Sequence, residues 1–169
     1  MQQILYSTSA DIDTIFEFYD MAIAHQKKVF NKHWQGFSRE LVGREINEKR
    51  QYKILVDGVI ASVFAITLND PEIWQEKDGD AAVYIHRIVT HPDFRGCGFV
   101  NRIIEWAKEF AKENKLQYIR MDTWADNEKL LAYYTGCGFE HVGKIEIAPG
   151  TSLPKHYEGI SLNLFEIAV

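Results

Sequence analysis

A glycine-containing segment past the middle of the chain has the composition of a phosphate-binding turn. It reads Arg95-Gly96-Cys97-Gly98, and it lies between a run typical of a β-strand and a run typical of an α-helix. The first N–H groups of a helix have no partner inside the helix, and the helix dipole makes that end electropositive. The glycines let a phosphate approach the backbone closely, and Arg95 adds a permanent positive charge. On these residues alone, the segment is either a phosphate site or an ordinary strand-to-helix turn.

Two familiar nucleotide-binding motifs do not fit this segment. A Walker loop ends in Gly-Lys-Ser or Gly-Lys-Thr, and neither follows here. A Rossmann fingerprint needs a third glycine where this chain has Asn101, and it normally opens its domain. The sequence therefore disfavours a nucleotide-binding oxidoreductase.

The turn resembles the cofactor motif of the GNAT superfamily of N-acetyltransferases, Arg/Gln-x-x-Gly-x-Gly/Ala. Arg95 and Gly98 stand at the matching positions, whereas Val100 replaces the small residue at the end of the motif. Val100 also belongs to the apolar stripe of the following helix, so we expect it to pack inward. The resemblance implies that acetyl-coenzyme A (acetyl-CoA) is the co-substrate.

A second motif of the same family follows in the expected register, as Asn127, Tyr134 and Gly138-Phe139. Seven residues are about two helical turns, so Asn127 and Tyr134 face the same side of one helix. By resemblance, the asparagine holds the cofactor arm and the tyrosine hydroxyl acts as general acid near the sulfur. A phenol with a pKa of about 10 can protonate a thiolate whose thiol has a pKa of about 8.5. Without the register match, a helix cap and a core aromatic would explain both residues.

The resemblance also implies that the cofactor's pantetheine arm pairs with the strand before the turn. His86, two residues before Ile88, is then either the base that takes a proton from the amine or a structural histidine. We expect Arg87 to be a structural ion-pair partner. The predicted cofactor-binding residues are Ile88, Val89, Thr90, Arg95, Gly96, Cys97, Gly98, Phe99, Val100, Asn127 and Tyr134.

The acceptor is expected to be the amine of a small molecule or a peptide, and its identity stays open. Family acceptor sites are built from the first two helices, their loop and the last strands. Aromatic side chains there can hold a cation or a ring, although ordinary packing explains each one equally well. The candidates are Trp34, Phe37, Trp74, His156 and Tyr157. The alternative function is a non-catalytic acyl-CoA sensor or binding module, which would need the turn but not Tyr134.

The elements that must position these residues are indicated by hydrophobic periodicity and by turn residues. They predict an α/β fold with a mixed, mostly antiparallel sheet of six or seven strands and helices on both faces. Ser9 and Ser38 are expected to cap the first two helices, and Asp57-Gly58 to join a hairpin. Segments 71–80 and 148–154 are expected to be loops. The predicted strands are 3–7, 52–56, 59–68, 82–90, 118–123, 139–147 and 160–167.

Length, composition and charge limit the number of domains, the partners and the location that the sequence allows. The 169 residues suit one N-acetyltransferase domain over 1–169, and 46% hydrophobic residues suffice for a core. A net charge of −5 with scattered basic residues disfavours nucleic acid. The apolar runs are too short for a membrane span, and the first residues lack the features of a signal peptide. Two cysteines, Cys97 and Cys137, complete no metal site, so we expect no metal and a reduced, cytoplasmic enzyme that can form a homodimer.

Overall fold

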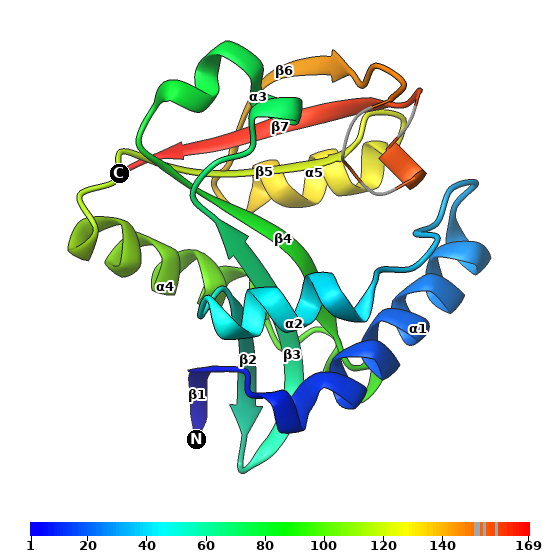
Figure 1. Ribbon diagram of the computed structural model, residues 1–169, viewed down its shortest axis with the longest axis vertical. Helices are drawn as coiled ribbons and strands as arrows, with labels where there is room; N and C mark the ends of the chain where they lie inside the picture. The colour runs from blue at the N-terminus through cyan, green and yellow to red at the C-terminus, as the bar shows by residue number, and fades with distance from the viewer. Residues whose placement is uncertain (151–152, 154, 158) are drawn as a thin grey trace. The chain divides into compact units, whose positions relative to one another are not determined.

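Figure 1 shows the computed structural model of the chain, which describes residues 1–150, 153, 155–157 and 159–169. The strands are β1 (Gln2–Tyr6), β2 (Gln51–Val56), β3 (Val59–Thr67), β4 (Ala82–Thr90), β5 (Tyr118–Trp124), β6 (Glu140–Glu146) and β7 (Ser161–Ala168). The α-helices are α1 (Ile12–Val29), α2 (Arg39–Asn47), α3 (Pro71–Trp74), α4 (Phe99–Glu113) and α5 (Glu128–Gly136). The short 3-10 turns are η1 (Ser9–Asp11), η2 (Gln75–Gly79), η3 (Pro92–Phe94) and η4 (Lys155–Tyr157).

The seven strands follow the order β1-β2-β3-β4-β5-β7-β6. β4 and β5 run parallel, whereas β1 with β2, β2 with β3, β5 with β7, and β6 with β7 are antiparallel. The predicted mixed and mostly antiparallel sheet is therefore confirmed. Within the described residues, no helix is long and apolar enough to cross a membrane.

The chain divides into two compact units. The first contains Met1–Ile66 and Arg87–Phe99, and the second contains Thr67–His86 and Val100–Val169. The division passes through β4 after His86. A single domain over 1–169 stays a prediction.

The first unit is built on the predicted β2–β3 hairpin, in which Val56 pairs with Val59 across Asp57-Gly58. The Ser38 hydroxyl accepts the N–H of Leu41 at 3.1 Å and caps α2, as its sequence position predicted. Helix α1 continues to Val29, because its last two turns contain helix-forming residues such as Ala24, Gln26 and Lys27. The buried apolar cluster of the first unit joins α1 and α2 to β3 and β4. It comprises Ile15, Phe18, Tyr19, Val42, Val63 and Val89.

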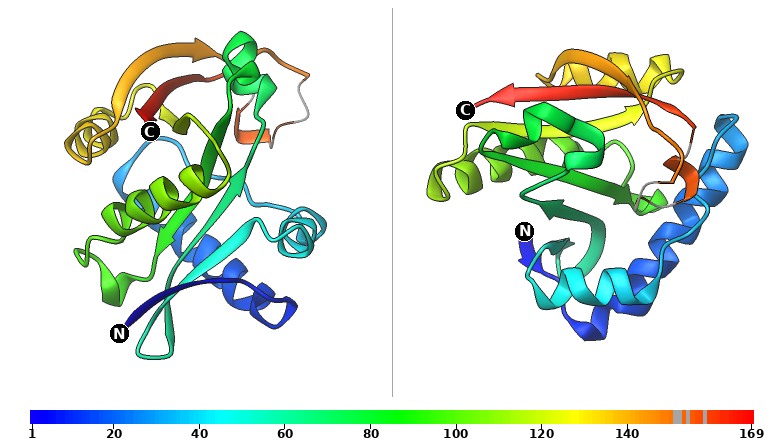
Figure 2. Two further views of the ribbon diagram at one scale, coloured as in Figure 1. Left: turned by 90° about the vertical axis from the view of Figure 1, so that its left-hand side faces the viewer. Right: turned by 45° about the horizontal axis from the view of Figure 1, so that its top comes forward.

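The second unit places α4 and α5 with β5, β6 and β7, and both views in Figure 2 show β6 and β7 side by side. The predicted stripe of α4 is buried throughout: Val100, Ile103, Ile104, Ala107 and Ala111. The loop expected over 71–80 was wrong, since Pro71 opens α3 and η2 follows. Proline suits the first helical position, and the Asp70 carbonyl accepts the Trp74 N–H at 2.9 Å. Of the loop expected over 148–154, residues 151, 152 and 154 lie outside the described part.

Candidate functional site

The phosphate-turn candidate lies between η3 and α4, as the sequence predicted. Gly96 and Gly98 have φ angles of +82° and +73°, a left-handed conformation that disfavours every other residue type except asparagine and aspartate. A Cβ added at either position meets no atom within 4 Å, so the constraint is the backbone conformation and not a lack of space. Cys97 and the Arg95 side chain are exposed. The turn therefore presents an accessible guanidinium directly before the first N–H groups of α4.

The strand before the turn has one hydrogen-bonding edge directed at β3. The Ser62 hydroxyl donates to the Val89 carbonyl at 2.8 Å, and the His91 N–H donates to the Ala61 carbonyl at 2.9 Å. Because successive backbone groups of a strand point to opposite edges, the carbonyls of Ile88 and Thr90 point away from β3. This edge has the form that an extended ligand needs for strand-like pairing.

Arg87 interrupts the regular geometry of β4. Its φ of +51° is left-handed, which is uncommon for a residue with a side chain. Its guanidinium pairs with the buried Glu45 carboxylate and donates to the Tyr19 hydroxyl at 3.1 Å. The expected structural ion pair is therefore present. In an extended strand, His86 and Ile88 would point to the same face. Because Arg87 between them is not extended, this alternation does not hold here.

Asn127 and Tyr134 lie at the start and near the end of α5. The Asn127 Oδ1 accepts the Leu130 N–H at 3.2 Å, so this residue caps the helix, which was the structural alternative for it. Tyr134 is 9% exposed and packs its ring against Phe139 and Phe165, at centroid distances of 6.1 and 5.8 Å. Burial raises the pKa of Tyr134, and Tyr133 and Cys137 add to the effect. Tyr134 therefore keeps its proton at neutral pH, so its hydroxyl can donate a hydrogen bond or a proton.

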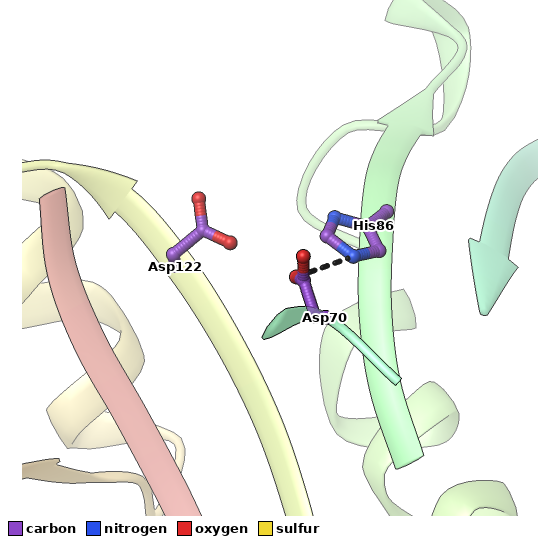
Figure 3. A group of neighbouring side chains, drawn as sticks. All are labelled: Asp70, His86 and Asp122. Carbon is purple, nitrogen blue, oxygen red and sulfur yellow. Dashed lines mark ion pairs between the residues drawn. The ribbon is translucent and has the colours of Figure 1, made fainter. Parts of the chain in front are cut away.

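His86 lies in a cluster with two carboxylates, shown in Figure 3. The His86 Nε2 is 3.1 Å from the Asp70 Oδ2, and the Asp122 carboxylate faces this pair from β5. One nitrogen or oxygen from each of the three residues lies within 4.8 Å of the others. This residue set can hold a proton or a cation, including a metal ion. The expectation that the protein binds no metal stays a prediction.

The Asp122 carboxyl has an unusual protonation equilibrium. Burial raises its pKa from 3.8 to about 7; the nearby His86 opposes the rise and Asp70 adds to it. Asp122 therefore changes its charge in the neutral range, as groups that exchange protons in active sites commonly do.

A buried arginine lies two residues before Asp122 on β5. The Arg120 side chain, 1% exposed, pairs with Asp80 at 2.6 Å and Glu166 at 2.8 Å. It also donates to the Lys77 carbonyl at 2.8 Å and the Tyr84 hydroxyl at 3.1 Å. Arg120 thus ties β4, β5, β7 and the segment after α3 together beside the Asp122 cluster.

The five aromatic or histidine candidates for the acceptor site fall into separate groups. Trp34 and Phe37 form an edge-to-face pair at 5.4 Å and pack on the apolar cluster of the first unit. Trp74 is 2% exposed, and the Arg120 guanidinium carbon lies 4.6 Å from the centre of the Trp74 ring. This environment favours a packing role for Trp74 over contact with an acceptor. His156 and Tyr157 are ring neighbours at 4.8 Å in η4 of the second unit.

Sequence reasoning missed Asp70 and Asp122. Asp70 lies just after the predicted strand 59–68, and Asp122 lies within the predicted strand 118–123, so neither position marks a site residue. One signal was present: β5 reads Tyr-Ile-Arg-Met-Asp-Thr-Trp, with both charges on the same face. A charge on a largely buried strand needs a partner, and this requirement singles out Arg120 and Asp122 on β5.

Comparison with known proteins gives a consistent result. The model of the acetyltransferase (GNAT) family matches residues 16–139. The chain is 28% identical over 74 residues to the uncharacterized N-acetyltransferase YesJ of Bacillus subtilis strain 168; these residues are 44% of this chain and 41% of that protein. The match thus spans about two fifths of the length of this curated relative.

Solved structures share the fold. A GNAT-family acetyltransferase from Listeria monocytogenes 4b F2365 superimposes with a TM-score of 0.79 at 20% identity, covering 99% of this chain and 95% of that one. The structure of yncA from Salmonella typhimurium with its cofactor acetyl-CoA has a TM-score of 0.67 at 13% identity, covering 99% and 93%. At these low sequence identities, the similarity to the solved structures shows a shared fold and nothing more.

Proposed function

Because this chain belongs to the acetyltransferase (GNAT) family and is an acyltransferase, we propose that it moves the acetyl group of acetyl-CoA to a primary amine by direct attack on the thioester. The Asn127–Tyr134 register on α5, with Tyr134 buried and protonated, is the observation that carries the proposal. It supplies an acid for a thiolate leaving group, which a module that only binds acyl-CoA does not need.

The donor side of the reaction uses the turn and the strand edge. The pyrophosphate would bind the N–H groups of the turn and the start of α4, with Arg95 supplying charge. The pantetheine arm would pair with the edge of residues 88–90 that points away from β3. The Asn127 amide nitrogen would hold the arm while its oxygen caps α5. These interactions depend on backbone geometry more than on particular side chains. The left-handed glycines of the turn, Gly96 and Gly98, are consistent with this requirement.

The chemical step needs a neutral amine and a protonated leaving group. His86 is the proposed base, since a neutral imidazole accepts a proton near neutral pH. The amine nitrogen then attacks the thioester carbon, the C–S bond breaks, and the Tyr134 hydroxyl gives its proton to the departing sulfur. We propose that Trp34, Phe37, His156 and Tyr157 contact the acceptor; the burial of Trp74 makes it the weakest of the five candidates.

The test compares Tyr134→Phe with Tyr133→Phe, its neighbour on the same helix, which is 47% exposed. We expect Tyr134→Phe to leave acetyl-CoA affinity near the wild-type value in calorimetry and to lower turnover by about 10² to 10⁴, the range for one acid–base group. Tyr133→Phe should change neither quantity. Turnover at the wild-type level in Tyr134→Phe would remove this residue from the mechanism.

The acceptor itself is found by testing a panel of amines for release of free thiol from acetyl-CoA. Polyamines, amino acids, aminoglycosides and peptides with free N-termini cover the open classes. Acetyl-CoA binding with no thiol release from any of them would favour the alternative, a non-catalytic sensor.

A further inference from the structure

His86 and Asp122 come together just beyond the point where β4 and β5 stop pairing. The last residues in the parallel register of these strands are Tyr84 and Arg120. His86 and Asp122 come two residues later on their strands, so they share faces with Tyr84 and Arg120. The hydrogen bond between Arg120 and Tyr84, 3.1 Å long, shows that these faces are directed at each other. The two strands thus bring an imidazole and a carboxylate together.

Asp70 adds a second carboxylate to this cluster. It stands at the N-cap of α3, where an aspartate side chain usually accepts an N–H of the first helical turn. The Asp70 side chain makes no such bond, and the helix N–H groups of Ile73 and Trp74 go to the Asp70 carbonyl, at 3.3 and 2.9 Å. The Asp70 N–H donates to the Asp78 carboxylate at 2.5 Å. The backbone of Asp70 is therefore held in place, while its carboxylate is directed at His86 (Figure 3).

The Asp70 Oδ2 is buried and has no hydrogen-bond partner in the part of the chain that the structure describes. The side chain is 9% exposed, and the His86 Nε2 lies 3.1 Å from the Oδ2 without forming a hydrogen bond to it. Asp122 likewise receives no hydrogen bond from the described residues. Carboxylates that give up water without gaining donors are costly to bury, and a cation placed between them offsets that cost.

The spacing of these atoms fits the ligands of one metal ion. Ligands about 2.0–2.2 Å from a zinc ion lie about 2.9–3.5 Å from each other, and the separation of 3.1 Å between the His86 Nε2 and the Asp70 Oδ2 falls in this range. One nitrogen or oxygen from each of Asp70, His86 and Asp122 lies within 4.8 Å of the others. Rotation of the Asp122 side chain has to close a remaining gap of at most about 1–2 Å.

We propose that Asp70, His86 and Asp122 bind one divalent transition-metal ion, through the two carboxylates and the His86 Nε2. Imidazole and carboxylate together are a ligand set typical of zinc, and three protein ligands leave a position for water. His86 takes part in a further interaction within the protein. This suits a metal ligand, because the second nitrogen of a metal-bound histidine is normally held by the protein. The site uses neither cysteine, so the cysteine count did not predict it.

The effect of the ion on activity rests on the proposed function, in which His86 is the base. A metal-bound imidazole has the metal on one nitrogen and a proton on the other, so it has no electron pair left for the proton of the amine. The bound ion should therefore inhibit acetyl transfer, and a chelator that removes the ion should restore it.

Calorimetric titration of the metal-free protein with Zn²⁺ tests the site directly. We expect the wild type to bind a single ion. Asp70→Asn, Asp122→Asn and His86→Gln should each weaken binding at least about tenfold, since even residues that only support a metal ligand contribute about 10- to 100-fold. Circular dichroism checks that each variant folds. Because all three variants address the same ion, any two that fold decide the result.

Two controls exclude other zinc ligands. Glu113→Gln removes an exposed carboxylate of the same unit and should keep the wild-type affinity. Cys97→Ser combined with Cys137→Ser removes the thiols, which also bind zinc, and should still bind the single ion. Zn²⁺ binding that is lost with the cysteines, that is unchanged in Asp70→Asn and Asp122→Asn, or that is absent from the wild type would overturn the inference.

Activity measurements separate the metal site from the proposed function. Zn²⁺ should lower the acetylation of an accepted amine, and EDTA should restore it; mass spectrometry of the acetylated product is the readout, because zinc also binds the free thiol of CoA. Asp70→Asn should need at least about tenfold more Zn²⁺ for the same inhibition. Single-ion binding that depends on the aspartates, without acetylation of any amine, supports the metal site and refutes the proposed function alone. Such binding without inhibition of an active enzyme would refute the inhibitory role.

Discussion

Replacing Arg120 by methionine tests whether the buried charge network holds the strands beside the candidate site. Arg120 is 1% exposed and is the partner of Glu166, whose side chain is 17% exposed, at 2.8 Å. Methionine fills a similar volume, so the change removes charge and hydrogen bonds while it keeps most of the packing against Trp74 and Tyr118. The Glu166 carboxylate is then left largely buried without its cation.

The expected loss of stability follows from these exposures. Breaking a buried ion pair by removing one partner costs about 3–5 kcal/mol of unfolding free energy. Asp80, 46% exposed, regains water and adds at most about 1 kcal/mol. We therefore expect a loss of about 4 kcal/mol, which for a chain of this size lowers Tm by roughly 8–16 °C.

Denaturant unfolding monitored by circular dichroism gives the free energies. Arg120→Met combined with Glu166→Gln removes the orphaned charge and should recover a large part of the loss, whereas Glu166→Gln alone should cost less than Arg120→Met. A loss below about 1 kcal/mol in Arg120→Met would show that the network adds little stability, as exposed ion pairs do.

Three further changes probe the turn, the helix cap and acid stability. Gly98→Glu should abolish acetyl-CoA binding in calorimetry, because the side chain adds bulk and repels the phosphate charge. Gly98→Ala should mainly add backbone strain of about 1–2 kcal/mol. Normal acetyl-CoA affinity in Gly98→Glu would contradict the phosphate assignment. Asn127→Ala should lose about 1 kcal/mol of stability and weaken acetyl-CoA binding, while Asn127→Asp should keep the cap and weaken binding only. Burial alone would raise the pKa of Asp11. The Lys53 ammonium group at 2.7 Å and the Thr8 N–H together outweigh this rise, so the pKa of Asp11 is lowered below 3.8. This stabilisation is present above pH 3.8 and is lost as pH falls through the lower folded-state pKa, so Asp11→Asn should destabilise at pH 7 and have little effect at the acid end of a chemical-denaturation series.

Sequence patterns predicted the strands and the longer helices because local rules decide them. The Asp57-Gly58 hairpin, the Ser38 cap and the apolar stripe of α4 each depend on a few neighbouring residues. Helix α3 was missed because one turn has almost no periodicity to detect, and its start depends on Pro71 and the Asp70 carbonyl.

The candidate site was only partly predictable for a related reason. The turn and the α5 register are contiguous motifs, so the sequence contains them whole. The Asp70–His86–Asp122 cluster brings together residues 16 and 36 positions apart through strand pairing, which a single sequence does not specify. Only the two charges on β5 pointed toward it.

The left-handed residue Arg87 lies between two segments of β4 for which different roles are proposed. Before it, His86 is proposed to act through its side chain. The hydrogen bond between Tyr84 and Arg120 helps to hold β4 in register with β5 there. After it, Ile88 and Thr90 are proposed to act through backbone groups, while the Ser62–Val89 hydrogen bond fixes which edge is used. Conservative substitutions at Ile88 should therefore be tolerated, whereas any change at His86 should not. The ion pair of Arg87 with Glu45 helps to offset the cost of the unusual backbone conformation between these two segments.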